Sequence, residues 1–191
     1  MLFPNIRHMV AFIEVAQRGS VNSAAKIMNL SQPAVSQEVA KFEAVFGYAL
    51  FDRTPTGLTL NDLGRIALSR VMRAHQYLRD SISSHVSDTS ALNVTRILRR
   101  ISSNQLKFLI AVVEHGSIPA AREATQKSAT TLHKSLRALE LAIGIELFEK
   151  TSYGLKPRKE AETLANGVLL AFSELRQARA EIGRASCRER V

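Results

Sequence analysis

An internal repeat with a period of 97 residues constrains the fold more than any other feature of the sequence. Gly19 and Gly116 lie 116 − 19 = 97 positions apart, and each follows an apolar run and precedes a serine. The same offset aligns the Leu-Phe pairs at 50–51 and 147–148 and the Gly-Leu pairs at 57–58 and 154–155, without a gap. Most positions that differ keep their chemical type. The chain is therefore two copies of one module.

Length and charge agree with two small basic domains. The 191 residues, 46% of them apolar, suit two modest cores. The 26 Lys and Arg outnumber the 17 Asp and Glu, for a formal charge of +9, which favours a polyanionic partner. A single cysteine makes no intramolecular disulfide framework. No apolar run approaches the ~18 residues of a membrane span, and no signal peptide pattern opens the chain, so we expect a cytoplasmic protein without a membrane partner.

Apolar periodicity predicts the same series of elements in each copy. In the first copy, a helix ends at Gly19, a short second helix follows, and a third is capped by Ser31 and stopped by Gly47. Two short apolar runs around a Pro/Gly turn, within 49–60, predict a β-hairpin. An amphipathic helix then runs from about 61 to about 82. The expected fold is mainly α: two tandem winged helix-turn-helix domains, each with a small β-hairpin wing and a long C-terminal linker helix.

The residues of the first copy also resemble a known family. The motifs that carry the resemblance are Gly19-Ser20, Ala24-Ala25, Ser31-Gln32-Pro33-Ala34-Val35-Ser36, Phe42-Glu43, Leu50-Phe51, Arg53-Thr54 and Gly57-Leu58-Thr59. They are similar to the N-terminal domain of LysR-type transcriptional regulators over about residues 6 to 80, with a weaker, degenerate copy over about 103 to 181. The resemblance implies a bacterial, cytoplasmic, nucleoid-associated protein that binds double-stranded DNA as a dimer or tetramer. It also implies a C-terminal domain that senses a metabolite.

The predicted domain boundaries follow from the repeat and from one unusual tail. The expected segments are a first winged domain with its linker helix at 1–82, a Ser-rich linker at 83–102, a second winged domain at 103–181, and a foreign tail at 182–191. The tail equals the in-frame translation of ATC GGA AGA GCG TCG TGT AGG GAA AGA GTG, which resembles a widely used sequencing adapter. Without it the net charge is +9 − 2 = +7.

If the tail is foreign, the natural protein is expected to continue after Glu181 into an α/β sensor domain. An effector metabolite is expected only if that missing domain exists.

The third helix of the first copy is the candidate DNA-reading element. Val35, Val39 and Phe42 form its core-facing stripe. The residues expected to contact DNA are Ser31, Gln32, Pro33, Ser36 and Gln37. Glutamine pairs bidentately with adenine, serine both donates and accepts, and proline contacts a thymine methyl. The resemblance places this helix in the major groove, although the family often has arginine at the position of Gln37. The alternative is that these residues are simply solvated.

Three cations of the first copy are candidate phosphate contacts. Arg53 lies at the wing, where family members follow phosphates and the minor groove, and its alternative is a surface ion pair with Asp52 or Glu43. Lys26 and Lys41 are further candidates, each with the alternative of an ordinary exposed lysine. Phosphate contacts position a protein but read no sequence.

The second copy keeps the apolar and capping positions of the module but replaces the residues that its third helix is expected to expose. The candidates for a second DNA face are Thr130, His133, Lys134, Arg137 and Lys150. This face is basic where the first is rich in amides, which favours attraction to phosphates over base reading. The alternative is a domain kept for packing and dimer geometry.

Other classes of protein find little support in the sequence. Histidines are scattered singly, no ligand spacing suits a metal, and no serine lies in a nucleophile-elbow pattern, so we expect no enzyme, no metal and no cofactor. An alternative function is a protein-interaction module with DNA binding limited to the first repeat. The linker helices are expected to pair, either in a homodimer or between the two repeats of one chain. Their apolar residues are Ile66, Val71, Met72 and Leu78 in the first copy and Leu164, Val168, Leu169, Phe172 and Leu175 in the second.

Overall fold

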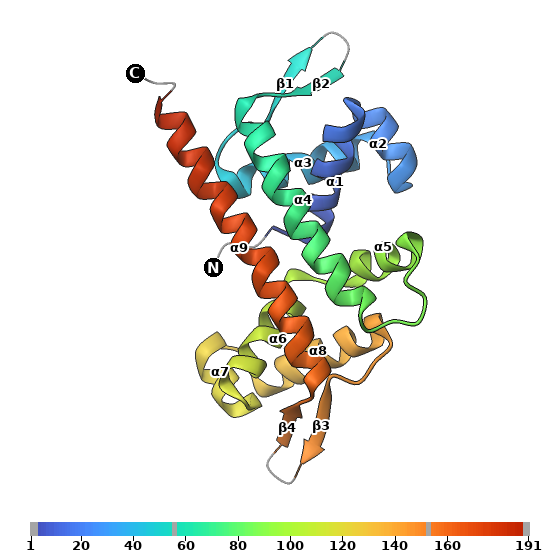
Figure 1. The fold of residues 1–191 in the computed structure, drawn as a ribbon, viewed down its shortest axis with the longest axis vertical. Helices are drawn as coiled ribbons and strands as arrows, with labels where there is room; N and C mark the ends of the chain where they lie inside the picture. The colour runs from blue at the N-terminus through green and yellow to red at the C-terminus, as the bar shows by residue number, and fades with distance from the viewer. Residues whose placement is uncertain (1–3, 55–56, 152–153, 189–191) are drawn as a thin grey trace. The chain divides into compact units, whose positions relative to one another are not determined.

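The structure, a computed structural model, describes residues 4–54, 57–151 and 154–188 and is mainly helical with two small hairpins (Figure 1). The first copy consists of α1 (Ile6–Arg18), α2 (Val21–Met28), α3 (Gln32–Phe46), β1 (Phe51–Thr54), β2 (Gly57–Leu60) and α4 (Asp62–Ser83). After α5 (Ala91–Arg100), the second copy consists of α6 (Ser103–His115), α7 (Ile118–Thr125), α8 (Ala129–Ile143), β3 (Phe148–Thr151), β4 (Gly154–Pro157) and α9 (Lys159–Arg188). The predicted fold class, two tandem winged helix-turn-helix domains, is confirmed.

The repeat register is preserved element by element. α1 begins at residue 6 and α6 at residue 103, so the offset of 97 found in the sequence is the offset of the structure. The same offset separates the first residues of α3 and α8, at 32 and 129, and of α4 and α9, at 62 and 159. The predicted wing tips at 55–56 and 152–153, and residues 189–191 of the predicted tail, lie outside the described residues.

The chain divides into two compact units. The first unit is Met1–His75 with Ala171–Val191, and the second is Gln76–Leu170. Each long helix therefore contributes to both units. This division differs from the continuous segments expected from the sequence, because the packing follows the long helices as well as the repeat.

Short polar caps begin the first three helices of the first unit, and left-handed residues end them. The Ser20 and Ser31 hydroxyls accept from the Ser23 and Ala34 amides, both at 3.3 Å. Asn29 stops α2 at φ 54°, a left-handed conformation that asparagine tolerates. The tight turn between α2 and α3 is therefore encoded locally.

Aromatic rings fill the core of the first unit. Phe12 of α1 stacks on Phe42 of α3, with ring centroids 4.6 Å apart, and Phe46 follows at 4.9 Å from Phe42. Val35 and Val39 are also buried, so the predicted inward stripe of α3 is confirmed. This packing fixes which face of α3 remains outside.

The first wing is tied to the end of α1. β1 and β2 pair antiparallel, with Phe51 opposite Leu60 and Thr54 opposite Gly57. The Leu58 amide donates to the Gly19 carbonyl at 3.2 Å. A Cβ on Gly57 would lie 2.5 Å from that oxygen, so the close approach requires glycine.

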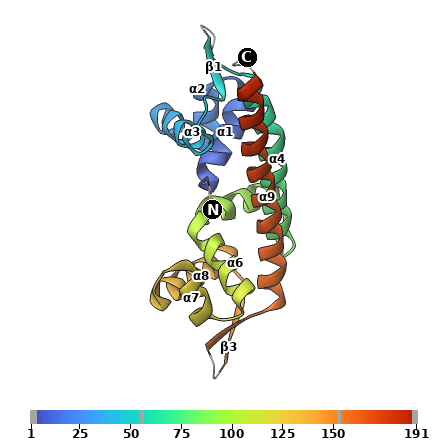
Figure 2. The ribbon, with the colours of Figure 1, turned by 90° about the vertical axis from the view of Figure 1, so that its left-hand side faces the viewer.

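The second unit repeats this architecture and adds a helix that the sequence did not predict. Leu132, Leu136 and Leu139 bury the inner face of α8. α5 lies within the segment 83–102 that was interpreted as a linker, and it buries Val94, Ile97 and Leu98. Figure 2 shows the ribbon from a second side, with α6, α7 and α8 grouped together. The Ser-rich stretch therefore leads into an ordered part of the second unit.

Candidate nucleic-acid interface

The outer face of α3 presents amide and hydroxyl groups to solvent. Gln32, Ser36 and Gln37 are exposed, as is Pro33 in the first turn. Among the described residues, no hydrogen bond or ion pair engages the side chains of Gln32, Ser36 and Gln37. Their donors and acceptors are therefore available to a ligand, on a helix whose orientation is set by its buried face.

Ser31 has a structural role at this surface. Its hydroxyl accepts from the Ala34 amide and begins α3, while the residue itself stays exposed. A hydroxyl has a second lone pair and a proton, so capping leaves it capacity for another hydrogen bond. A contact between Ser31 and DNA stays a prediction.

The three candidate phosphate contacts of the first copy are all exposed. Lys26 lies on α2, Lys41 on α3 and Arg53 on β1. In the described part of the chain, Arg53 forms no ion pair with Asp52 or Glu43. Its guanidinium is therefore not neutralised by the carboxylates considered in the sequence analysis.

A carboxylate at the base of each wing holds the hairpin to the preceding helix. Glu43 Oε1 accepts from the Leu50 amide at 2.7 Å. In the second copy, Glu140 Oε1 accepts from the amides of Leu147 and Phe148, at 2.8 and 3.1 Å. The two glutamates lie 140 − 43 = 97 residues apart, in equivalent positions of the repeat, and the sequence did not predict this role. The carboxylates position the wings relative to α3 and α8.

A second polar contact links α3 to α1. His8 Nε2 lies 3.0 Å from Glu38 Oε2, and both side chains are largely buried. Burial lowers the pKa of His8, Glu38 opposes that shift, and Lys41 adds to it. The contact joins α3 to α1 at the residue next to Gln37, and the periodicity of apolar residues does not predict it.

The candidate DNA face of the second copy is exposed, but its positive charge is partly neutralised. Thr130, His133, Lys134, Arg137 and Lys150 all reach the surface. Arg137 Nη1 lies 3.2 Å from Glu140 Oε2, so this arginine is already paired with the carboxylate that holds the wing. A cleft of about 840 Å³ lies beside β3–β4, and its lining includes His133, Lys150 and Arg158 together with Glu140, Glu146 and Glu149.

The second wing is held less closely than the first. A Cβ on Gly154 would meet nothing within 4 Å, whereas the equivalent Gly57 is packed against Gly19. The Thr151 hydroxyl donates to the Gly154 carbonyl at 2.9 Å, as Thr54 does to Gly57 at 3.1 Å. The two hairpins therefore share a turn contact, but only the first has a glycine pressed against the preceding helices.

The fold and its exposed helix define a winged helix-turn-helix protein with two copies of the module. The family model described as "Bacterial regulatory helix-turn-helix protein, lysR family" matches residues 6–65 and again residues 103–162. The chain belongs to this family, whose members are DNA-binding transcriptional regulators. Both copies match the family model, and the second does so although its presented residues differ from those of the first.

Individual relatives agree with the family assignment. The chain is 28% identical to the HTH-type transcriptional regulator GalR of Pseudomonas putida over 173 residues, which are 91% of this chain and 42% of that protein. It is 46% identical to TdcA of Escherichia coli over 70 residues, 37% of this chain and 22% of that regulator. It is 25% identical to the nitrogen assimilation regulatory protein nac of Klebsiella aerogenes over 162 residues, 77% of this chain and 49% of that protein. The chain thus spans less than half the length of these relatives. No solved structure matches it.

Two other kinds of site are absent from the described residues. No helix in this part of the chain combines the length and apolar character needed to cross a bilayer. No group of three or more His, Cys, Asp or Glu in the same residues is placed to hold a metal ion.

Proposed function

We propose that this chain is a sequence-specific DNA-binding regulator of LysR type in which α3 of the first copy reads base edges. The observation that carries the proposal is the outer face of α3, where Gln32, Ser36 and Gln37 are exposed and unengaged within the described residues. A helix fits the major groove, and bidentate amides there discriminate adenine from the other bases. The buried valines and Phe42 hold this face outward.

Phosphate contacts supply the rest of the first interface in this proposal. Arg53 on the wing binds the DNA backbone, with Lys26 and Lys41 as further contacts. Their exposure and the formal charge of +9 support this assignment.

The second copy is proposed to bind DNA mainly through phosphates. His133, Lys134 and Lys150 are exposed and basic, which supports attraction without base reading. Thr130 and Arg137 belong to the same proposed surface. The ion pair between Arg137 and Glu140 favours, for part of this face, the second candidate function of a packing and pairing module.

Three properties of the whole protein belong to the same proposal. The protein acts in the bacterial cytoplasm at the nucleoid. It is a regulator and not an enzyme, as its similarity to transcriptional regulators supports. These 191 residues bind DNA without needing a metabolite, whereas a metabolite response would require a sensor domain of the kind that the family resemblance implies.

We also propose that the linker helices pair within one chain. The contacts of α4 with α9 in the first unit, described below, support pairing between the two repeats over a homodimer joined by two α4 helices.

The test compares one variant with its repeat-equivalent control. Duplexes are first selected from a random pool by the wild-type chain, and binding is then measured by anisotropy on a selected duplex and on a random one. Gln37→Ala should cost about 1–3 kcal/mol on the selected duplex and little on the random one. Lys134→Ala, the equivalent position in α8, should weaken both duplexes similarly. Equal sequence preferences for wild type and a Gln32→Ala/Gln37→Ala double variant would overturn the assignment.

A further inference from the structure

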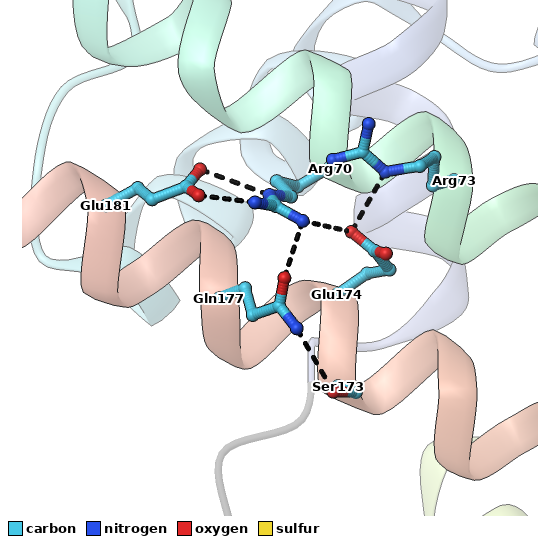
Figure 3. Close-up of polar contacts among 6 residues, drawn as sticks. All are labelled: Arg70, Arg73, Ser173, Glu174, Gln177 and Glu181. Atoms are coloured by element: carbon cyan, nitrogen blue, oxygen red, sulfur yellow. Dashed lines mark hydrogen bonds and ion pairs between the residues drawn. The ribbon is translucent and has the colours of Figure 1, made fainter.

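Arg70 of α4 is the centre of a polar cluster in the first unit (Figure 3). Its guanidinium donates to Glu174 Oε2 at 3.1 Å, to Gln177 Oε1 at 2.5 Å and to both carboxylate oxygens of Glu181, all on α9. Arg73, one turn further along α4, donates to the same Glu174 oxygen at 3.1 Å. As the residue number rises along α4 it falls along α9, so the two helices run antiparallel here.

The cluster is partly withdrawn from water. The Arg70 and Glu174 side chains are 22% and 13% exposed, and that of Glu181 is 30% exposed. Burial alone would raise the pKa of Glu174, but the hydrogen bonds and charges of Arg70 and Arg73 together lower it. The hydrogen bond from Arg70 lowers the pKa of Glu181. Half-buried carboxylates of this kind are costly when their cation is removed.

The repeat places a glycine where this arginine would recur. Position 70 + 97 = 167 is Gly167, in the second unit. A Cβ on Gly167 would overlap the Ser81 hydroxyl of α4 and lie 2.8 Å from Ser81 Cβ. α4 and α9 therefore approach closely in the second unit, and the approach depends on the absence of a side chain at 167.

The cluster around Arg70 and the close approach at Gly167 together exclude pairing of two α4 helices or of two α9 helices. Two α4 helices paired in the same way would place Arg70 where Gly167 stands, against Ser81, and the helices would be forced apart. Two α9 helices would place Gly167 where Arg70 stands and leave Glu174 and Glu181 without their cation. Only α4 with α9 satisfies both contacts, which is the combination of attraction and exclusion that partner specificity requires.

We propose that α4 and α9 are complementary to each other within one chain and are not interchangeable. A single chain then forms, from its own two long helices, the interface that a symmetric dimer would form from two copies of one linker helix. Arg70 and Gly167 are the specificity-determining residues. This inference rests on the internal pairing proposed above, and it makes the chain a monomer that closes its own linker interface.

The first experiment reverses the charges in the full chain and follows thermal melting. Arg70→Glu should lower Tm, because three carboxylates then face one another. Adding Glu174→Arg and Glu181→Arg should restore part of the loss, since the glutamate introduced at position 70 regains opposite charges while Arg73 then faces the arginine introduced at position 174. Arg65→Glu is the control on the same helix, since the Arg65 and Asp62 side chains are 62% and 71% exposed, and it should change Tm little. Loss without recovery in the triple variant would contradict charge complementarity.

The second experiment tests the close approach with matched glycines of α9. Gly167→Ala should lower Tm, and Ser81→Gly in the same chain should recover it. Gly183→Ala is the control, because a Cβ there meets nothing within 4 Å, and it should leave Tm unchanged or higher. Equal effects at positions 167 and 183 would overturn the role of Gly167.

The third measurement is the mass in solution by light scattering over a hundredfold range of concentration. The expected mass is that of one chain, 21.1 kDa. A mass of two chains that falls to one on Arg70→Glu would overturn pairing within one chain. Binding to a random DNA duplex is measured on the same samples, so that failure of DNA binding is recorded separately from failure of helix pairing.

Discussion

Arg53 and Lys150 occupy equivalent positions on the two wings, 150 − 53 = 97 residues apart, and both are exposed. If each contacts one phosphate, its removal releases about one counterion fewer on binding. Arg53→Ala should therefore weaken binding to all duplexes similarly and flatten the slope of log K against log[salt] by about one unit. Lys150→Ala should act in the same way.

The measurement is anisotropy at several salt concentrations. Arg65→Ala is the control, because Arg65 is exposed but already paired with Asp62 on α4. An unchanged slope for Arg53→Ala would remove Arg53 from the interface.

At the residue scale, the sequence predicted surface positions well and polar partners poorly. Val35 and Phe42 face inward and Gln32 and Gln37 outward, as the three- and four-residue spacing of apolar side chains required. The bond from the Leu50 amide to Glu43 had no such signal, because it joins residues seven apart across a helix end. Contacts of this kind depend on how the chain turns, which periodicity does not specify.

At the element scale, the cluster around Arg70 predicts a defined response to acid. Glu174 and Glu181 have pKa values below their ordinary 4.5 in the folded chain. The unfolded chain therefore binds protons first as pH falls, so the stabilisation is complete above the unfolded pKa and is lost as pH falls through the lowered native values. Arg70 stays charged throughout, since the hydrogen bonds that it donates to Glu181 and Glu174 raise its pKa.

The test is urea denaturation of wild type and Arg70→Ala from pH 7 to below about pH 4, beneath the ordinary value of 4.5. The wild type should have the higher midpoint at pH 7, and the difference should shrink as the carboxylates protonate. The exposed pair of Arg65 and Asp62 provides the control, and Arg65→Ala should show little difference at any pH. A difference between wild type and Arg70→Ala that is independent of pH would mean that the cluster stabilises by packing alone.

Within the described residues, the elements that recur in the repeat were predicted, and α5, which does not recur, was missed. Every helix and strand of the first copy has its counterpart 97 residues on, with matching caps such as Ser31 and Ser128. α5 has no counterpart and follows a Ser-rich stretch, so neither repetition nor composition indicated it. Its buried Val94, Ile97 and Leu98 show that tertiary packing stabilises it.

At the scale of the whole molecule, one chain carries two unlike exposed faces, which we propose as its DNA-binding surfaces. The first presents amides and hydroxyls, and the second presents His133, Lys134 and Thr130 at the corresponding surface. The family assignment follows from the duplicated module, but the pairing of α4 with α9 could not be predicted from either copy alone. Arg70 and Glu174 are 104 residues apart, and their positions relative to the repeat are not equivalent.

This asymmetry decides what kind of DNA site the protein should bind. Symmetric dimers of helix-turn-helix proteins bind inverted repeats, because the two-fold axis of the protein matches that of the operator. In the function proposed above, the first copy reads bases and the second binds phosphates, so a single chain should select sequence on one side only. The other side should contribute affinity that depends on salt and not on sequence.

Selection of bound duplexes from a random pool, followed by sequencing, tests this claim most directly. The wild-type chain should enrich one short block of specified bases, without an inverted copy of that block at a fixed spacing. A Gln32→Ala/Gln37→Ala variant should lose the block, whereas His133→Ala/Lys134→Ala should keep it with lower affinity. Enrichment of an inverted repeat with two equivalent halves would contradict the account, because it would mean that two first copies, from two chains, bind the DNA together.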